Sequence, residues 1–174
     1  MIGIRLVRIP AIVLTCGAFC ISASAFAQSY KVEMVAEPAP AELSAAVRDA
    51  LGGDAMRVTG PGGTLCEVWL RKAVPAKPAA AEALGITFGQ LEEGTLVGAI
   101  RFPAEVKDYR RQRIKAGIYT LRYTLLPTDG NHMGVAPQRD FLLASPAAAD
   151  RDPATVSRDD ALKLSRKTTG TQHP

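Results

Sequence analysis

Residues 118–126 read Ile-Tyr-Thr-Leu-Arg-Tyr-Thr-Leu-Leu, and this stretch decides the fold that we expect. Its apolar and polar side chains alternate, with Tyr119, Leu121, Tyr123 and Leu125 standing against Thr120, Arg122 and Thr124. A period of two is that of a β-strand, and a separate polar face is typical of an antiparallel sheet with one side in water. We therefore predict an antiparallel strand here whose polar side chains face solvent.

Further segments with strand character lie on both sides of this stretch, separated by turns that contain Gly and Pro. They are residues 30–35, 56–59, 64–72, 95–102 and 138–144. The alternation of strands with long helices that marks an α/β fold is missing. Several short strands between such turns favour a sandwich-like antiparallel arrangement.

Two segments have the signature of helices instead. Residues 40–51 place Leu43, Val47 and Leu51 on one helical face, and Ser157 is a good N-cap for a second helix near the C-terminus. The predicted fold class is therefore mainly β: an antiparallel β-sandwich-like domain with one helix after the first strand and a C-terminal helix.

The first 27 residues have the order of a secretory signal. Arg5 and Arg8 precede an apolar run over residues 9–21, and a small-x-small motif ends at Ala27, before Gln28. The apolar run is shorter than the roughly 20 residues that span a bilayer. We expect cleavage near Ala27-Gln28, a periplasmic or secreted location, and no transmembrane segment in the mature chain.

Cleavage would also change the composition. The signal holds two of the three cysteines, so Cys66 alone would remain and no internal disulfide is expected. It also holds two of the 21 Lys and Arg residues, so the mature chain would have 19 basic and 17 acidic residues and a formal charge of +2. This charge is too small to favour nucleic acid as a partner. We expect one β-rich domain over residues 28–167 and a flexible tail over residues 168–174.

The segment between the last two expected strands holds the densest group of polar residues. The candidate binding residues there are Asp129, Asn131, His132, Arg139 and Asp140. A long loop on a sheet scaffold is where binding residues tend to lie. The alternative is a turn in which Asp and Asn supply local backbone chemistry, and this is the interpretation we favour.

The same loop raises a metal hypothesis. His132 with Met133 is a pair suited to copper, and His173 would join them if the tail folded back. The usual ligand spacings of zinc sites are absent from the sequence, as are the glycine patterns of nucleotide-binding loops and the Gly-x-Ser-x-Gly elbow of serine hydrolases. No cofactor can be assigned.

Trp69 is the only tryptophan, and strict alternation groups it with Glu67 and Arg71. An exposed aromatic flanked by charges can present a stacking platform to a sugar or a partner protein, so Trp69 is a further candidate binding residue. The alternative, which we favour, is burial beneath the first helix or a loop.

A basic run over residues 107–115 includes Arg110, Arg111 and Arg113. Such a run can attract acidic groups. The interpretation that we favour is a solvated hairpin edge that discourages association between sheets.

Two stretches resemble a group of secreted bacterial proteins. They are residues 114–121, Ile-Lys-Ala-Gly-Ile-Tyr-Thr-Leu, and residues 129–141, Asp-Gly-Asn-His-Met-Gly-Val-Ala-Pro-Gln-Arg-Asp-Phe, and the similarity continues through residues 157–160 to 169–174. The resemblance implies no activity and no catalytic residue. It directs attention to His132, Arg139, Asp140 and His173.

These observations favour an exported, non-catalytic binding or interaction module, with a protein, a small molecule or a glycan as its ligand. The poverty of catalytic groups leans against an enzyme without excluding one. The alternative is a periplasmic copper- or zinc-binding protein, or a small metal-dependent hydrolase, that uses His132.

Overall fold

The computed structural model describes residues 30–78, 85–108, 110–129 and 138–173. The predicted signal and the centre of the predicted binding loop lie outside these ranges. Within them, six strands form one antiparallel sheet in the order β1-β2-β3-β4-β7-β8. The strands are β1 (Lys31–Val35), β2 (Ala55–Gly60), β3 (Gly63–Leu70), β4 (Leu96–Phe102), β7 (Gly117–Leu125) and β8 (Asp140–Pro146).

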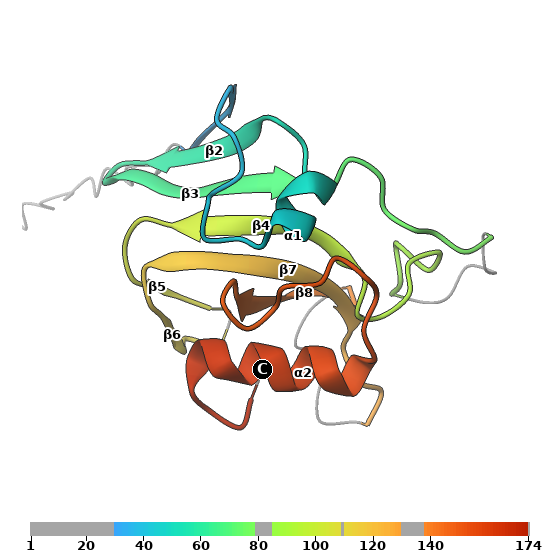
Figure 1. The fold of residues 1–174 in the computed structure, drawn as a ribbon. Coiled ribbons are helices and arrows are strands. Elements are labelled where there is room, and N and C mark those ends of the chain that lie inside the picture. Colours follow the sequence, from blue (N-terminus) through green and yellow to red (C-terminus); the bar gives the residue numbers. More distant parts are fainter. Residues whose placement is uncertain (1–29, 79–84, 109, 130–137, 174) are drawn as a thin grey trace, which may run out of the picture.

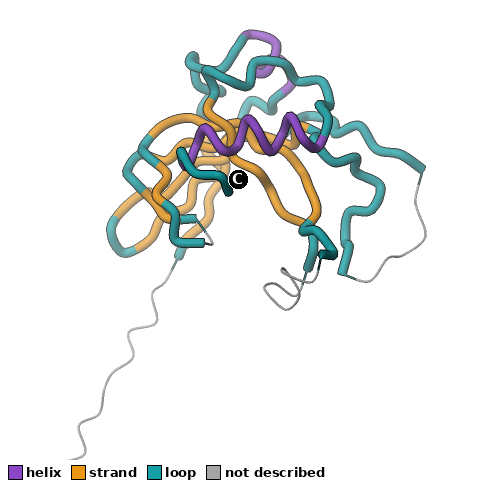
Figure 2. The backbone as a smooth tube through the Cα atoms, turned by 90° about the horizontal axis from the view of Figure 1, so that it is seen from below, coloured by secondary structure: helices purple, strands orange, loops and turns teal. Residues whose placement is uncertain are grey.

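The remaining described elements are short or lie beside this sheet. β5 (Val106–Lys107) and β6 (Arg113–Ile114) form a small two-stranded sheet, α1 (Ala45–Ala50) follows β1, and α2 (Arg158–Thr169) follows β8. The predicted class, mainly β with a helix after the first strand and a C-terminal helix, is confirmed. Both helices lie on the same side of the curved sheet (Figures 1 and 2).

The N-caps explain where the helices begin. α1 starts after Ser44, whose hydroxyl accepts a hydrogen bond from Val47 N, so it begins later than the predicted residue 40. α2 starts after Ser157, as predicted, and Asp160 N donates to the Ser157 hydroxyl. α2 reaches Thr169, beyond the predicted domain end at residue 167, and Gly170 ends it in the left-handed conformation with φ of 68°.

The main core lies between α1 and the sheet. Trp69 is fully buried there, together with Leu43 and Val47 from the α1 side and Leu96 and Ala99 from β4. Burying such side chains is the main favourable contribution to folding. The favoured interpretation of Trp69, burial beneath the first helix, is confirmed.

The polar face of β7 is not in water, and the prediction of a solvated side was wrong. Thr120, Arg122 and Thr124 are each 0% exposed. The connection from β8 to α2 crosses this face, and Asp150 within it pairs with Arg122. The alternation of residue types therefore separated the two faces of β7 correctly. The polar face, which we expected to be in contact with solvent, is covered by the β8–α2 connection.

The opposite face of the sheet is apolar and partly open. On β1, Val32 is 63% and Met34 is 65% exposed, and Leu70 on β3 is also exposed. Nearer β7 the same face is closed, because Tyr119, Leu121 and Tyr123 are buried. No described helix combines the length and apolar character needed to cross a bilayer.

Candidate functional site

The predicted binding loop is described only at its ends. Asn131, His132 and Met133 lie outside the described residues, so the hypotheses that rest on them stay predictions. Asp129 is exposed. Arg139 and Asp140 are described and lie at the start of β8.

Asp140 joins three parts of the chain. Its carboxylate accepts hydrogen bonds from Thr87 N at 2.7 Å, from Phe88 N at 3.0 Å and from the Tyr123 hydroxyl at 2.7 Å. Burial acts to raise the pKa of Asp140, but these donors outweigh it and hold the pKa below its ordinary value. Because its acceptor capacity is taken up by protein donors, Asp140 is a structural anchor.

Arg139 has a similar structural role. Its guanidinium donates from Nε at 3.1 Å and from Nη2 at 3.0 Å to Leu126 O, and its backbone N–H donates to Gly85 O at 2.7 Å. Arg139 and Asp140 therefore fasten residues 85–88 to the ends of β7 and β8. Both predicted binding residues thus use their side chains to hold neighbouring segments of the protein in place.

His173 lies against the turn that contains Arg110 and Gln112. Its Nδ1 is 3.4 Å from Arg110 Nη1, and the Thr171 hydroxyl donates to Gln112 Oε1 at 2.5 Å. The last described residues thus fold back onto the β5–β6 region. Among the described residues, no group of three or more His, Cys, Asp or Glu side chains is placed to hold a metal ion.

Trp69 is not available as a stacking platform, because it is 0% exposed. Its indole N–H donates to Glu37 O at 2.8 Å, and the guanidinium of Arg101 lies 5.8 Å from its ring centroid. The indole nitrogen and the ring face of Trp69 therefore both contact other parts of the protein. The suggestion that Trp69 is an exposed binding residue is corrected, because the side chain belongs to the core.

Beside Trp69 lies a charged cluster that sequence reasoning missed. Arg57 and Arg101 both pair with Glu67 and with Glu37, and the Nη2 of each arginine lies 2.6 Å from a Glu37 oxygen. Burial acts to raise the pKa of Glu67, but the two guanidinium groups hold it below its ordinary value. The register explains the cluster, since Glu67 is directly opposite both Arg57 and Arg101.

The buried Arg122 is a second structural group. Its Nε and Nη2 bond Asp150 at 2.7 Å each, and its remaining donors reach Gly94 O, Ala154 O and Asp152 O. The contacts with Asp150, Asp152 and Ala154 hold the β8–α2 connection on the sheet, and the contact with Gly94 ties in the segment before β4. Arg122 is saturated by protein acceptors and has no donor left for a ligand.

A cavity lies along β8, between this strand, α2 and the turn before β6. It has a volume of about 380 Å³. Its lining residues are Asp108, Arg110, Ile114, Leu126, Gln138, Asp140, Phe141, Leu142, Leu143, Ala144, Ser165, Thr168 and Thr169. A volume of this size falls in the range of small-ligand sites, roughly 300–1,000 Å³.

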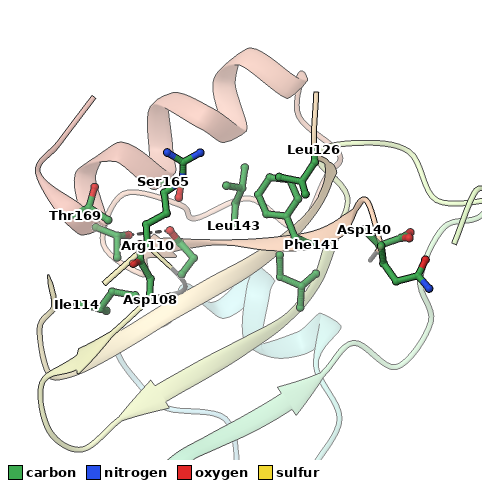
Figure 3. Close-up of a pocket in the computed structure, with 13 residues that line it drawn as sticks. Asp108, Arg110, Ile114, Leu126, Asp140, Phe141, Leu143, Ser165 and Thr169 are labelled. Atoms are coloured by element: carbon green, nitrogen blue, oxygen red, sulfur yellow. Dashed lines mark hydrogen bonds between the residues drawn. The ribbon is translucent and has the colours of Figure 1, made fainter. Parts of the chain in front are cut away.

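Apolar side chains form the floor of this pocket, which we call the β8–α2 pocket. Leu126, Phe141 and Leu143 gather below α2 (Figure 3). Asp140 lies at one end, and its carboxylate points away from the floor (Figure 3). The predicted binding loop therefore borders the pocket through Gln138 and Asp140.

The other end of the β8–α2 pocket is polar. Arg110 lies there beside Ser165 and Thr169 (Figure 3). The Asp108 carboxylate accepts hydrogen bonds from Gln112 N at 2.7 Å and from Gln112 Nε2 at 2.9 Å, which fixes the turn that carries Arg110. No sequence signal pointed to this pocket, because it arises where α2 packs against β8.

An apolar floor with a cation and hydroxyl groups at one end suits binding of an elongated, partly apolar ligand. The described lining residues include no His or Cys that could act as a nucleophile or base beside a hydroxyl. No protein-family model, curated protein or solved structure matches the chain, so the chemistry of the ligand has to be inferred from these residues.

Proposed function

We propose that the chain is an exported, non-catalytic binding module whose ligand occupies the β8–α2 pocket. The observation that carries this proposal is the pocket itself, an apolar cavity of about 380 Å³ with its polar groups gathered at one end. Ligand sites in proteins have this composition, in which a few polar groups orient a mainly apolar ligand.

The state of the other polar groups supports a binding role. Asp140 accepts hydrogen bonds from three protein donors, Arg139 donates twice to Leu126 O, and all five donors of the Arg122 guanidinium bond protein acceptors. Catalytic groups need a donor or acceptor directed at the substrate. The export part of the proposal rests on the signal-like order of residues 1–27 and its expected cleavage.

Titration of the mature chain with an amphipathic, anionic fluorescent dye, anilinonaphthalene sulfonate, tests the proposal. We expect one saturable site. Thr169→Trp would fill the polar end of the pocket and reduce dye affinity by at least about tenfold, which is a loss of about 1.4 kcal/mol.

Lys163→Trp is the matched control, because Lys163 is an exposed residue of the same helix whose Nζ pairs with Asp160. We expect it to leave dye affinity unchanged. Binding that Thr169→Trp does not weaken would place the dye on another surface, such as the open apolar face around Val32 and Met34, and would contradict the proposal.

A further inference from the structure

β8 is an edge strand of the six-stranded sheet. Residues of an antiparallel strand alternate between those whose backbone groups bond the neighbouring strand and those whose groups point away from it. Ala147 N donates to Ile118 O, and Leu126 N donates to Arg139 O. Odd-numbered residues of β8 therefore bond β7, and the backbone groups of the even-numbered residues face outward.

The outward groups are closed off at the C-terminal end of β8. Ala144 O accepts a hydrogen bond from the Thr168 hydroxyl at 2.8 Å. Pro146 has no N–H, and its carbonyl accepts from Ala149 N at 2.8 Å and Asp150 N at 3.1 Å. Among the described residues, the outward N–H and C=O of Leu142 and the outward N–H of Ala144 have no hydrogen-bond partner.

The β8–α2 pocket runs along this edge. Four consecutive residues of β8, from Phe141 to Ala144, line it. Side chains of consecutive strand residues point to opposite faces, so four in a row can line one cavity only where the strand's edge is part of the wall. The pocket thus combines unpaired backbone groups with an apolar floor.

The polar end of the pocket holds one cationic side chain. The guanidinium of Arg110 lines this end. The Asp108 carboxylate there is bonded to Gln112. An acidic group on a ligand would be attracted to this end.

We propose that the ligand of the β8–α2 pocket is an extended peptide segment with alternating apolar side chains and one acidic residue, which adds to the edge of β8 as a further strand. This inference rests on the proposed function, because it names the ligand class of the same pocket. Backbone hydrogen bonds to Leu142 and Ala144 supply affinity, the apolar floor takes alternate side chains, and the basic end selects the acid.

The peptide acetyl-Glu-Val-Thr-Val-Thr-amide tests the inference by calorimetric titration of the mature chain. Two N-methylated forms are compared with it, one methylated at both valines and the other at both threonines. Only alternate N–H groups of an added strand face its neighbour. One methylated form should therefore bind at least about tenfold more weakly, while the other keeps its affinity within about threefold.

Leu142→Pro and Leu142→Ala test the same pairing from the protein side. Proline removes the outward N–H of Leu142 without breaking a bond to β7, whereas alanine keeps that N–H and shortens a side chain that lines the pocket and is 48% exposed. We expect the proline variant to lose peptide affinity by about tenfold or more and the alanine variant to lose clearly less. Both should keep cooperative thermal unfolding.

The outcomes separate this inference from the proposed function. If the dye binds in a Thr169-dependent way but the peptide does not bind, or if both methylated forms bind equally well, strand addition is wrong and the binding pocket stands. If neither dye nor peptide binds, the proposed function fails as well.

Discussion

The Tyr123 hydroxyl donates a hydrogen bond of 2.7 Å to Oδ1 of Asp140, and this bond joins the centre of β7 to the start of β8. The same carboxylate also holds Thr87 N and Phe88 N. Burial, followed by the interaction with Asp140, raises the pKa of the Tyr123 phenol above its ordinary value. Tyr123 is therefore a neutral donor throughout the physiological pH range.

Tyr123→Phe should lower the free energy of unfolding by about 1–2 kcal/mol, because Asp140 loses a donor and the ring keeps its packing. Chemical denaturation measures this value. Tyr119→Phe is the comparison, since the Tyr119 hydroxyl donates at 2.8 Å to a neutral backbone carbonyl, Lys115 O, and not to a carboxylate. If the two substitutions lowered the free energy of unfolding equally, the Tyr123–Asp140 hydrogen bond would contribute no more to stability than the hydrogen bond used for comparison.

Asp140→Asn should make stability less dependent on acid. The folded-state pKa of Asp140 is lowered, so its ionised form contributes stability that is present above the unfolded-state pKa of about 3.9 and is lost as the pH falls through the folded value. Thermal unfolding of both proteins from pH 7 downward measures this. The melting-temperature difference should be constant down to about pH 5 and should narrow below about pH 4. A difference that does not change with pH would contradict the role of the charge.

Trp69 should report on unfolding of the core. As the only tryptophan, and a fully buried one, it should emit at short wavelength and resist quenching by iodide in the native protein. Its emission should shift to longer wavelength in one cooperative step with denaturant. Strong quenching of the native protein by iodide would mean that Trp69 is exposed.

Arg122→Met should lower the free energy of unfolding by about 3–5 kcal/mol, because it leaves the buried Asp150 carboxylate without its cation. Lys163→Ala breaks the exposed pair with Asp160 and should cost less than about 1 kcal/mol. The double change Arg122→Met with Asp150→Leu should restore only part of the loss. The carbonyls of Asp152 and Ala154 would lose the donor that Arg122 supplies.

Gly94→Ala should be strongly destabilising. Gly94 has φ of 86°, and a Cβ there would collide with Val156 O. The left-handed conformation alone costs a non-glycine residue roughly 1–2 kcal/mol, and the collision adds to it. Gly62→Ala is the matched control, because a Cβ there meets no atom within 4 Å. Equal melting temperatures of the two variants would contradict this expectation.

Much of the fold could be predicted from local pattern. The alternation in residues 118–126 corresponds to β7, and Ser157 is the N-cap of α2 as expected. What alternation could not tell is which face would be covered. Arg122 was expected in water, but the β8–α2 connection supplies Asp150 as a buried partner for it. That partner is 28 residues away in sequence and has no local signature.

The candidate site was less predictable. Arg139 and Asp140 carry side chains suited to ligand binding, yet they bond Leu126 and residues 87–88. Residue type cannot show whether a polar group is already satisfied by a distant part of the chain. The β8–α2 pocket escaped prediction for a related reason, since its lining comes from four segments that meet only in the folded protein.

The order of the sheet has a consequence for how the chain can fold. β1, β2, β3 and β4 are neighbours both in sequence and in space, and only the short excursion through β5 and β6 separates β4 from β7. Strands that pair with their sequence neighbours need no crossover past another strand, which keeps the contact order lower than in a sheet with crossovers, even though the β3–β4 connection spans residues 71–95. The sheet can therefore grow strand by strand in the direction of synthesis, and β8, the strand that borders the pocket, is the last to be added.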